Sequence, residues 1–568
     1  MLPPSAIVRR TIRSWWSLDV LLWAAVVWVV VFWRLGYLSL LDPDEAHYAQ
    51  LTREMVRTRQ WMVPLLEGVP FIDKPVLYHW LQAGTSWLFG ETEFALRLPS
   101  AGAAIALIAM VRWTGRSLGP PAVGRSAALM FASTPLTFAL ASIGVFDMVF
   151  AAFLVGSVGC LLVAAVQRRK NVELAGWLLL VLAVMTKGPV AALLVVLFGL
   201  LLAAVPSTRS IVRSLHWFTG LALVALLSAP WFVYMASRYG DHFVRTYVLA
   251  GNLWYFTRPT AFSGRQSDTW FYARTFLGAC FPWSVLALGV GVDALWSRRT
   301  LSIEERALWL WLLLIIGFFS LAGFKLDTYI FPAAPAACLL VALAWGRQVE
   351  PRLQPATRAA GWGVALVLLG GGLTLAVTMF RIELGLSAVA AILPAACIGG
   401  GMALAWALRE SRAPRVTGLL VTTLLVVYGV VVVEGFPVLE RSRPTAPIGR
   451  WVDRHASRDQ PLGVYGLDDW RASIRFYSRR PLLVLHDGAE VAQFFERYPA
   501  GYAVMLRTDA ARLRAAGVAL HRVGSRRAIV GRSGKFIRKQ RWGRIVVTAA
   551  GSGRMLAEND VEPDLPDN

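Results

Sequence analysis

Acidic residues at the start of a predicted helix are the first candidates for catalysis. The segment Asp42-Pro43-Asp44-Glu45 predicts a helix that begins at Pro43, with Asp42 as its cap and Glu45 in a capping box. Asp44 shares a helical face with Tyr48, and partial loss of water there would make its carboxylate a better proton acceptor. We predict Asp44 as catalytic and Tyr48 as a substrate contact. For Asp42 and Glu45 the alternative is stabilisation of the positive helix terminus.

Two lysines stand just before prolines that predict helix starts. Lys74 precedes Pro75, and Lys187 lies two residues before Pro189. A cation at the positive end of a helix is disfavoured unless an anion shares the space, and a bound phosphate would resolve this conflict. We therefore predict Lys74 and Lys187 as phosphate ligands, with Lys325 as a further candidate. For Lys187 the alternative is a side chain that reaches the lipid headgroups.

Asp147 is the second candidate for a catalytic carboxylate. It lies between Phe146 and Met148 at the start of an apolar run, where a charge is costly unless it is paired or functional. Capping of the helix is the alternative. Guanidinium groups outside the membrane could also hold a phosphate. The remaining candidates are Arg265 for the phosphate, and Glu45, Asp73, Arg97, Arg258 and Tyr329 for other substrate contacts.

A metal site has little support in the sequence. His47, His79 and Asp73 could ligate a divalent metal ion, but no tight spacing of His and acidic residues supports a site. The cofactor is therefore left unknown, with a divalent metal as the option.

The composition indicates a membrane protein that crosses the bilayer many times. Of the 568 residues, 56% are apolar and 16% are charged, and these values exclude an ordinary soluble globule and a disordered chain. The net charge of +22 could suit nucleic acid, but no nucleic-acid motif is present, so we expect none as a partner. Membrane lipids and phosphorylated lipid substrates are the expected partners, and we expect a monomer.

Apolar runs predict about thirteen transmembrane helices between residues 18 and 434. Arginine-rich loops place the N-terminus inside by the positive-inside rule. Residues 1–439 then form a transmembrane catalytic domain with extracytoplasmic loops 36–98 and 237–269, and residues 440–568 lie outside. The candidate site residues all fall on this extracytoplasmic side. Because the arginines that set the orientation lie on the opposite side, this convergence is partly independent evidence of an extracytoplasmic site.

Residues 440–568 have a soluble pattern that predicts a small α/β domain. Predicted strands at 464–465, 482–485 and 502–506 alternate with predicted helices near 468–478, 488–498 and 508–516. Residues 510–557 contain twelve basic residues and no acidic one. We interpret this segment as a solvated, partly disordered basic tail, and the alternative is a patch attracted to anionic lipid.

Several separated motifs resemble the bacterial branch of the protein O-mannosyltransferase superfamily, which includes the lipid A aminoarabinose transferases. The resemblance covers roughly residues 15–345 and implies a GT-C fold and transfer of a sugar from a polyprenyl phosphate outside the cytoplasmic membrane. It also implies that Asp44 and Asp147 are essential acids and that Lys74 binds phosphate. The motifs are Asp44-Glu45, residues 71–80, Arg97-Leu98-Pro99-Ser100, Thr186-Lys187-Gly188-Pro189 and Lys325-Leu326-Asp327-Thr328-Tyr329.

The predicted function is inverting transfer of a sugar from undecaprenyl phosphate to lipid A or another anionic envelope glycolipid, at the periplasmic side of the inner membrane. One alternative is a protein O-glycosyltransferase of the same superfamily. A second is a flippase or transporter of lipid-linked sugar, which would also bury charges among many spans. A third is a non-catalytic assembly subunit whose basic tail recruits a partner.

Overall fold

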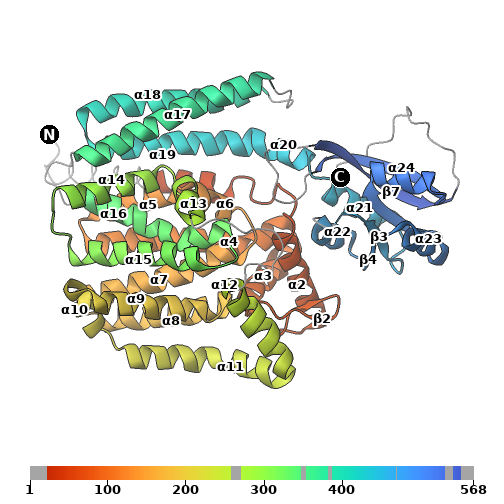
Figure 1. Ribbon diagram of the computed structural model, residues 1–568, viewed down its shortest axis with the longest axis horizontal. Coiled ribbons are helices and arrows are strands. Elements are labelled where there is room, and N and C mark those ends of the chain that lie inside the picture. The colour runs from red at the N-terminus through yellow and green to blue at the C-terminus, as the bar shows by residue number, and fades with distance from the viewer. Residues whose placement is uncertain are drawn as a thin grey trace, which may run out of the picture.

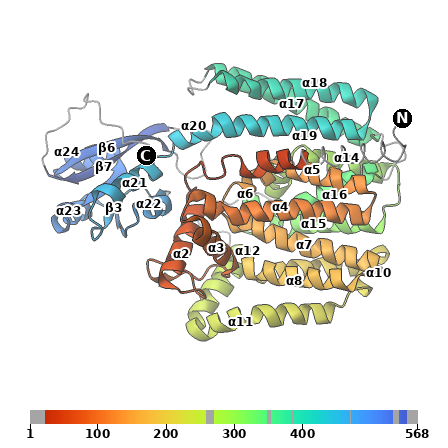
Figure 2. The ribbon, with the colours of Figure 1, turned by 180° about the vertical axis from the view of Figure 1, so that it is seen from behind.

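The protein is a helical bundle with a small sheet domain at one end (Figure 1). The computed structural model describes residues 22–257, 270–346, 353–381, 387–467, 470–530 and 541–551. Figure 2 shows the same arrangement from behind, with α2 (Asp44–Thr58) and α3 (Leu77–Phe89) at the end of the bundle that faces the sheet domain. The candidate site residues belong to this end.

The first half of the bundle is built from long apolar helices that pack in sequence order. Its central pair is α4 and α7, with α8 packed along α7. Small residues allow close packing, since a β-carbon at Gly115 would lie 2.8 Å from the backbone of Gly124. The helices are α4 (Glu93–Leu118), α5 (Pro121–Ala132), α6 (Pro135–Ala141), α7 (Phe146–Gln167), α8 (Lys170–Lys187), α9 (Val190–Ala204), α10 (Arg209–Arg213) and α11 (Trp217–Phe243), continued by η3 (Val244–Trp254) and α12 (Tyr255–Thr257).

The second half covers one side of this bundle. Its helix α16 packs on α5, and α17 packs on α14 and α18. The elements are α13 (Phe271–Ala279), α14 (Trp283–Trp296), α15 (Ile303–Leu321), η5 (Asp327–Ala333), α16 (Ala334–Gly346), α17 (Pro355–Arg381), η6 (Ala388–Ala391), α18 (Ile392–Glu410), α19 (Ala413–Val430), η7 (Val431–Gly435) and α20 (Phe436–Arg441).

Within the described residues, seven helices are long and apolar enough to cross a membrane. The number rises to nine if two bent pairs, Val190–Ala204 with Pro206–Arg213 and Phe271–Ala279 with Trp283–Trp296, each count as one span. Every predicted apolar run contains helix, but several of these helices are too short to pass as separate spans. The helical membrane fold is confirmed, whereas the predicted number of thirteen spans is not.

The C-terminal domain contains a five-stranded sheet with the order β4-β3-β5-β7-β6. Strand β3 (Leu462–Tyr465) is parallel to β4 (Leu482–Leu485) and β5 (Tyr502–Leu506), and α22 (Arg471–Ser478), α23 (Gly488–Arg497) and α24 (Arg507–Ala515) follow these strands. The three predicted strands and three predicted helices are therefore present. α21 (Thr445–His455) leads into the domain and packs on α22.

The basic segment is not a solvated tail throughout. Residues Leu520–Val530 and Arg541–Ala550 form the antiparallel strands β6 and β7, and β7 also pairs with β5. Ala528, Ile545 and Val547 are buried in the core beneath the sheet, which fixes these strands although arginines flank the apolar residues. The prediction was wrong for these two stretches, and residues 531–540 and 552–557 lie outside the described residues.

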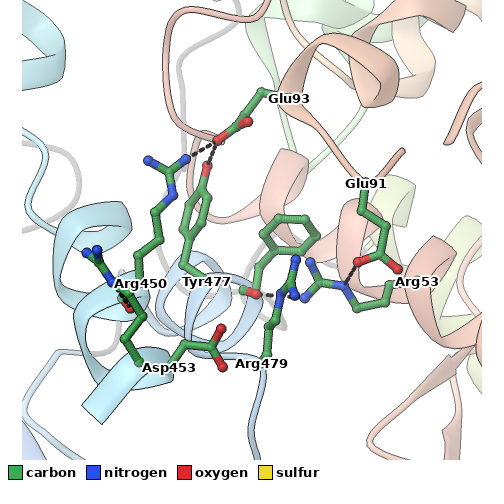
Figure 3. Close-up of a pocket in the computed structure, with 9 residues that line it drawn as sticks. Arg53, Glu91, Glu93, Arg450, Asp453, Tyr477 and Arg479 are labelled. Atoms are coloured by element: carbon green, nitrogen blue, oxygen red, sulfur yellow. Dashed lines mark hydrogen bonds and ion pairs between the residues drawn. The ribbon is translucent and has the colours of Figure 1, made fainter. Parts of the chain in front are cut away.

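The sheet domain is joined to the bundle through α2 and α4. The Tyr477 hydroxyl donates to Glu93 Oε1 at 2.9 Å and accepts from the backbone N–H of Leu40 at 2.8 Å. Arg53, on α2, donates to the carbonyl of Phe476 at 2.6 Å and to Glu91 at 2.8 Å. Figure 3 shows Arg53, Glu91, Glu93 and Tyr477 at the junction. These four residues line a cavity of about 380 Å³.

Asp42 belongs to this junction. We predicted that it caps α2, and this prediction was wrong, since Pro43 holds the cap position. Its carboxylate accepts hydrogen bonds from the backbone N–H of Ser473, at 2.8 Å, and from the Ser473 hydroxyl. Burial raises the pKa of Asp42 from 3.8 to about 6, and the bonds from Ser473 and the charge of Arg443 only partly oppose this. The protonated form of Asp42 is therefore favoured by folding.

This pKa predicts a pH-dependent contribution of Asp42 to stability. Because the native state binds the proton more tightly, stability from this group is complete below about pH 4 and is lost as the pH rises through about 6. Asp42→Asn should thus be more stable than the wild type at pH 7, by up to about 3 kcal/mol, and similar to it at pH 4. Thermal unfolding of both proteins in detergent from pH 4 to 7 measures this difference. A difference that does not change with pH would contradict the prediction.

Candidate active site

Asp44 is the first residue of α2, and its side chain remains exposed. Pro43 occupies the cap position instead of the first helical position that we predicted. Tyr48, Leu51 and Met55, which follow on the same face, are buried in the body of the protein, as the periodicity indicated. The buried face fixes α2 against the bundle and leaves Asp44 at its accessible end.

Other charged groups lie close enough to act on Asp44. Although Asp44 keeps exposed surface, the neighbouring protein removes part of the water around its carboxyl and raises its pKa above the ordinary value, and the carboxylates of Asp147 and Asp73 raise it further. The ammonium of Lys74 opposes them. These groups come from α2, from the loop before α3 and from α7, so the fold gathers three separate motifs around Asp44.

Glu45 and Arg97 form a buried ion pair. Arg97 donates two parallel hydrogen bonds to the Glu45 carboxylate, at 2.7 and 2.9 Å, and both side chains are at most 2% exposed. Glu45 also accepts from the backbone N–H groups of Leu41, at 2.7 Å, and Gly144, at 2.6 Å. These partners and the charge of Arg97 lower the pKa of Glu45 despite its burial.

This geometry corrects our expectation that Glu45 and Arg97 contact the substrate. Arg97 also donates to three backbone carbonyls, those of Leu35, Leu38 and Ser39. With these bonds formed and no exposed surface, neither side chain can reach a ligand. Both residues instead position the start of α2.

Replacing Arg97 by Gln should destabilise the protein strongly. The change would leave the Glu45 charge buried without its partner, which costs about 3–5 kcal/mol. The measurement is the thermal unfolding midpoint in detergent, with Arg57→Gln as the control because Arg57 is exposed on α2. If Arg97→Gln unfolded at the control's temperature, the pair would not have this structural role.

Lys187 and Asp147 form a second ion pair at the centre of the site. Lys187 Nζ donates to Asp147 Oδ1 at 2.8 Å, and the side chains are 10% and 12% exposed. The Thr328 hydroxyl donates to the same Asp147 oxygen at 3.3 Å. Aromatic rings surround the ammonium, with centroids 4.3, 5.1 and 5.1 Å from Nζ, and they belong to Tyr329, Phe146 and Phe150.

The helix that we predicted to begin after Lys187 is present, since α9 starts at Val190 with Pro189 at its cap position, but Lys187 itself also ends a helix. It is the last residue of α8, where the negative end of the helix dipole favours a cation. The negative end of α8 therefore offsets the electrostatic conflict with the start of α9 that pointed to a phosphate at Lys187. Its position beside Asp147 and among aromatic rings is what makes it a candidate ligand.

Lys74 and Asp73 form a neighbouring pair in the loop before α3. Lys74 Nζ donates to Asp73 Oδ1 at 3.0 Å and keeps 19% of its side chain exposed. Both groups act electrostatically on Lys187. The structure thus brings together Asp44, Asp73, Lys74, Asp147 and Lys187.

Lys325 is oriented differently from what we expected of a phosphate ligand. Its ammonium donates to the carbonyls of Ser320 and Ala322, both at 2.7 Å, and the residue is 4% exposed. It therefore stabilises the carbonyl end of α15. The neighbouring Thr328, which we did not select as a site residue, donates a hydrogen bond to Asp147. Its position between the selected motif residues Asp327 and Tyr329 could have identified it from the sequence.

Tyr48 lies among these charges. It is buried against Tyr78, His79 and Phe146, with its ring centroid 5.2 Å from that of Phe146. Burial and the charge of Asp44 raise the pKa of Tyr48 well above its ordinary value. Its hydroxyl therefore stays protonated and can donate a hydrogen bond.

The candidate metal ligands do not gather into a site. Among the residues that the structure describes, no group of three or more His, Cys, Asp or Glu side chains could hold a metal ion. His79 is buried with Nδ1 3.1 Å from the Thr52 hydroxyl, and burial lowers the pKa of His79 to about 3. His47 is half-buried against Phe71. Arg258 and Arg265 lie outside the described residues.

Comparison with known proteins places this site in a recognisable fold. Residues 73–234 match the family model described as dolichyl-phosphate-mannose-protein mannosyltransferase. In the crystal structure of ArnT from Cupriavidus metallidurans bound to undecaprenyl phosphate, 97% of the chain superposes on 93% of this one, with a TM-score of 0.71 and 22% identity. The fold is therefore that of the membrane-spanning GT-C glycosyltransferases.

Curated relatives resemble the chain over part of its length. Undecaprenyl phosphate-alpha-4-amino-4-deoxy-L-arabinose arabinosyl transferase 1 from Sodalis glossinidius is 33% identical over 62% of this chain and 65% of its own. The transferase of the same name from Serratia proteamaculans is 28% identical over 59% of this chain and 60% of its own. The matched region thus spans less than two thirds of these relatives, and the resemblance read from the sequence motifs is confirmed.

Proposed function

We propose that the protein is an inverting glycosyltransferase that takes a sugar from a polyprenyl phosphate, with undecaprenyl phosphate as the carrier. The observation that carries the proposal is the convergence of Asp44, Asp147, Lys74 and Lys187 at one end of an apolar bundle. A lipid-linked phosphate has its charge at the membrane boundary and its tail in lipid, so a site of this kind suits it. The site then lies on the periplasmic side of the bacterial inner membrane.

In this mechanism Lys74 and Lys187 hold the phosphate of the donor. The bond between the anomeric carbon and the phosphate oxygen breaks, and the polyprenyl phosphate leaves with the electron pair. Cationic hydrogen-bond donors stabilise the charge that develops on this oxygen, an effect of about 3–4 kcal/mol for one preorganised donor in other enzymes. Asp147 and Thr328 orient Lys187 through the bonds described above.

Asp44 acts on the acceptor. Attack from the side opposite the phosphate forms the new bond and inverts the configuration. For a hydroxyl acceptor, Asp44 takes the proton, and its raised pKa suits this role. For an acceptor that is itself a phosphate no base is required, and the Asp44 carboxylate stabilises the oxocarbenium-like centre. Tyr48 and Tyr329 line the same space and contact the sugar or the phosphate.

The names of the relatives direct the choice of donor and acceptor. They are named as transferases of 4-amino-4-deoxy-L-arabinose from undecaprenyl phosphate. We propose this aminosugar as the donor sugar and lipid A, an anionic glycolipid of the envelope, as the acceptor. Among the described residues, the C-terminal basic segment makes no contact with the candidate site. We therefore assign catalysis to residues 1–439.

Asp44→Asn should reduce transfer by about 10²- to 10⁴-fold while the protein level stays the same. The purified protein is incubated in liposomes with undecaprenyl phosphate-linked aminoarabinose and lipid A, and the products are measured by mass spectrometry. Asp241→Asn is the matched control, because Asp241, near the end of α11, is 72% exposed and paired with Arg245 of η3.

Other outcomes separate the alternatives. Near-normal transfer by Asp44→Asn would contradict the assigned role of Asp44. Product on protein, with none on lipid A, would indicate a protein O-glycosyltransferase. Movement of the lipid-linked sugar across the liposome membrane without any product would indicate a flippase.

A further inference from the structure

The hydroxyl of Tyr247 is a buried polar group that none of the assignments above uses. The residue is 2% exposed, and its hydroxyl has no hydrogen-bond partner among the described residues. A buried hydroxyl without a hydrogen-bond partner is unfavourable, so such a group calls for an explanation. One explanation is that the hydroxyl donates its hydrogen bond to a bound ligand.

The hydroxyl of Tyr247, on η3, is directed at the edge of the candidate site. Gly188, the residue after Lys187, packs against this hydroxyl so closely that a β-carbon there would collide with it. The Asp73 carboxylate acts electrostatically on the same phenol, and a β-carbon at Gly251 would lie 3.5 Å from Asp73. The hydroxyl therefore lies against the helix end that carries Lys187 and within electrostatic range of Asp73, the neighbour of Lys74.

The ring of Tyr247 is held firmly in this position. It stacks on Phe243 with centroids 5.0 Å apart and 9° between the planes, and it contacts Trp231 edge-on at 5.9 Å. The side chain of Asn252 donates to the Tyr247 carbonyl at 2.7 Å. Because packing fixes the ring, the direction of the hydroxyl does not depend on the missing hydrogen bond.

The charge balance of the site explains why a neutral donor is needed. In the structure each lysine is already paired, Lys187 with Asp147 and Lys74 with Asp73. With Asp44 included, these five side chains carry no net positive charge. An incoming phosphate gains a hydrogen bond from Tyr247 without the loss of an ion pair.

We propose that Tyr247 binds the phosphate of the polyprenyl phosphate donor through its hydroxyl, between Lys74 and Lys187. This inference rests on the proposed function and adds a ligand to that site. Tyr247 recognises the phosphate group and not the isoprenoid tail. Its removal should therefore weaken the binding of a phosphorylated lipid and leave the binding of the corresponding alcohol unchanged.

The test is Tyr247→Phe, which keeps the aromatic packing and removes only the hydroxyl. Binding of undecaprenyl phosphate and of undecaprenol to the full chain in nanodiscs is measured for the wild type and the variant. We expect undecaprenyl phosphate to bind about 10- to 100-fold more weakly to Tyr247→Phe, since hydrogen bonds to charged groups have effects of this size. Undecaprenol should bind equally to both. Tyr234→Phe, on the partly exposed face of α11, is the control and should match the wild type.

The outcomes separate this inference from the proposed function. Equal affinity of Tyr247→Phe and the wild type for undecaprenyl phosphate overturns the inference and leaves the proposed function in place. Equal loss of affinity for undecaprenyl phosphate and undecaprenol also overturns it, since that result indicates a structural role. A wild type that binds undecaprenyl phosphate no better than undecaprenol contradicts the proposed function itself.

Discussion

The carboxylate of Glu45 joins three segments that are far apart in the chain. It binds Arg97 of α4, the backbone just before α2 and the N–H of Gly144 in the loop before α7. Asp44 is its neighbour in sequence, and Asp147 follows Gly144 by three residues. One buried carboxylate thereby fixes the relative position of the two candidate catalytic acids. Such a pair is preorganised by the fold, because no ligand is required to bring the acids together.

The same end of the bundle holds two of its ammonium groups in pairs with carboxylates. Lys187 with Asp147 and Lys74 with Asp73 each satisfy their partner at about 3 Å. Unpaired ammonium groups at a membrane boundary would be poorly solvated and would attract any headgroup. Pairing with acids avoids this cost and also sets the direction of each ammonium. In the proposed function, the donor phosphate approaches ammonium groups that are already paired, so an anion without further hydrogen-bond donors gains little there, which favours selectivity.

Much of the fold could be predicted from the sequence because apolar runs reveal membrane helices and alternation of strands and helices reveals the α/β domain. The gathering of Asp44, Lys74, Asp147 and Lys187 was also predictable, since all follow from one topology. The burial and the partners of each individual charged side chain could not be predicted. The sequence does not distinguish a buried pair such as Glu45 and Arg97 from a pair of ligands, and the orientation of Lys325 toward carbonyls depends on where α15 ends. Strands β6 and β7 were missed because their arginines outweigh their short apolar alternation.

The C-terminal domain is coupled to the site through α2. Asp42 binds Ser473 just before the helix begins, and Arg53 binds the Phe476 carbonyl toward its other end. Both partners belong to α22, so this one helix contacts both sides of the segment that carries Asp44. These contacts support α2 from the side of the domain, while Glu45 binds the start of α2 to α4 and to the loop before α7. Asp147 and Lys187 belong to α7 and α8 deeper in the bundle. The position of Asp44 relative to Lys74 and Lys187 is therefore supported both by Glu45 and by a domain whose described residues place no side chain among these charged groups.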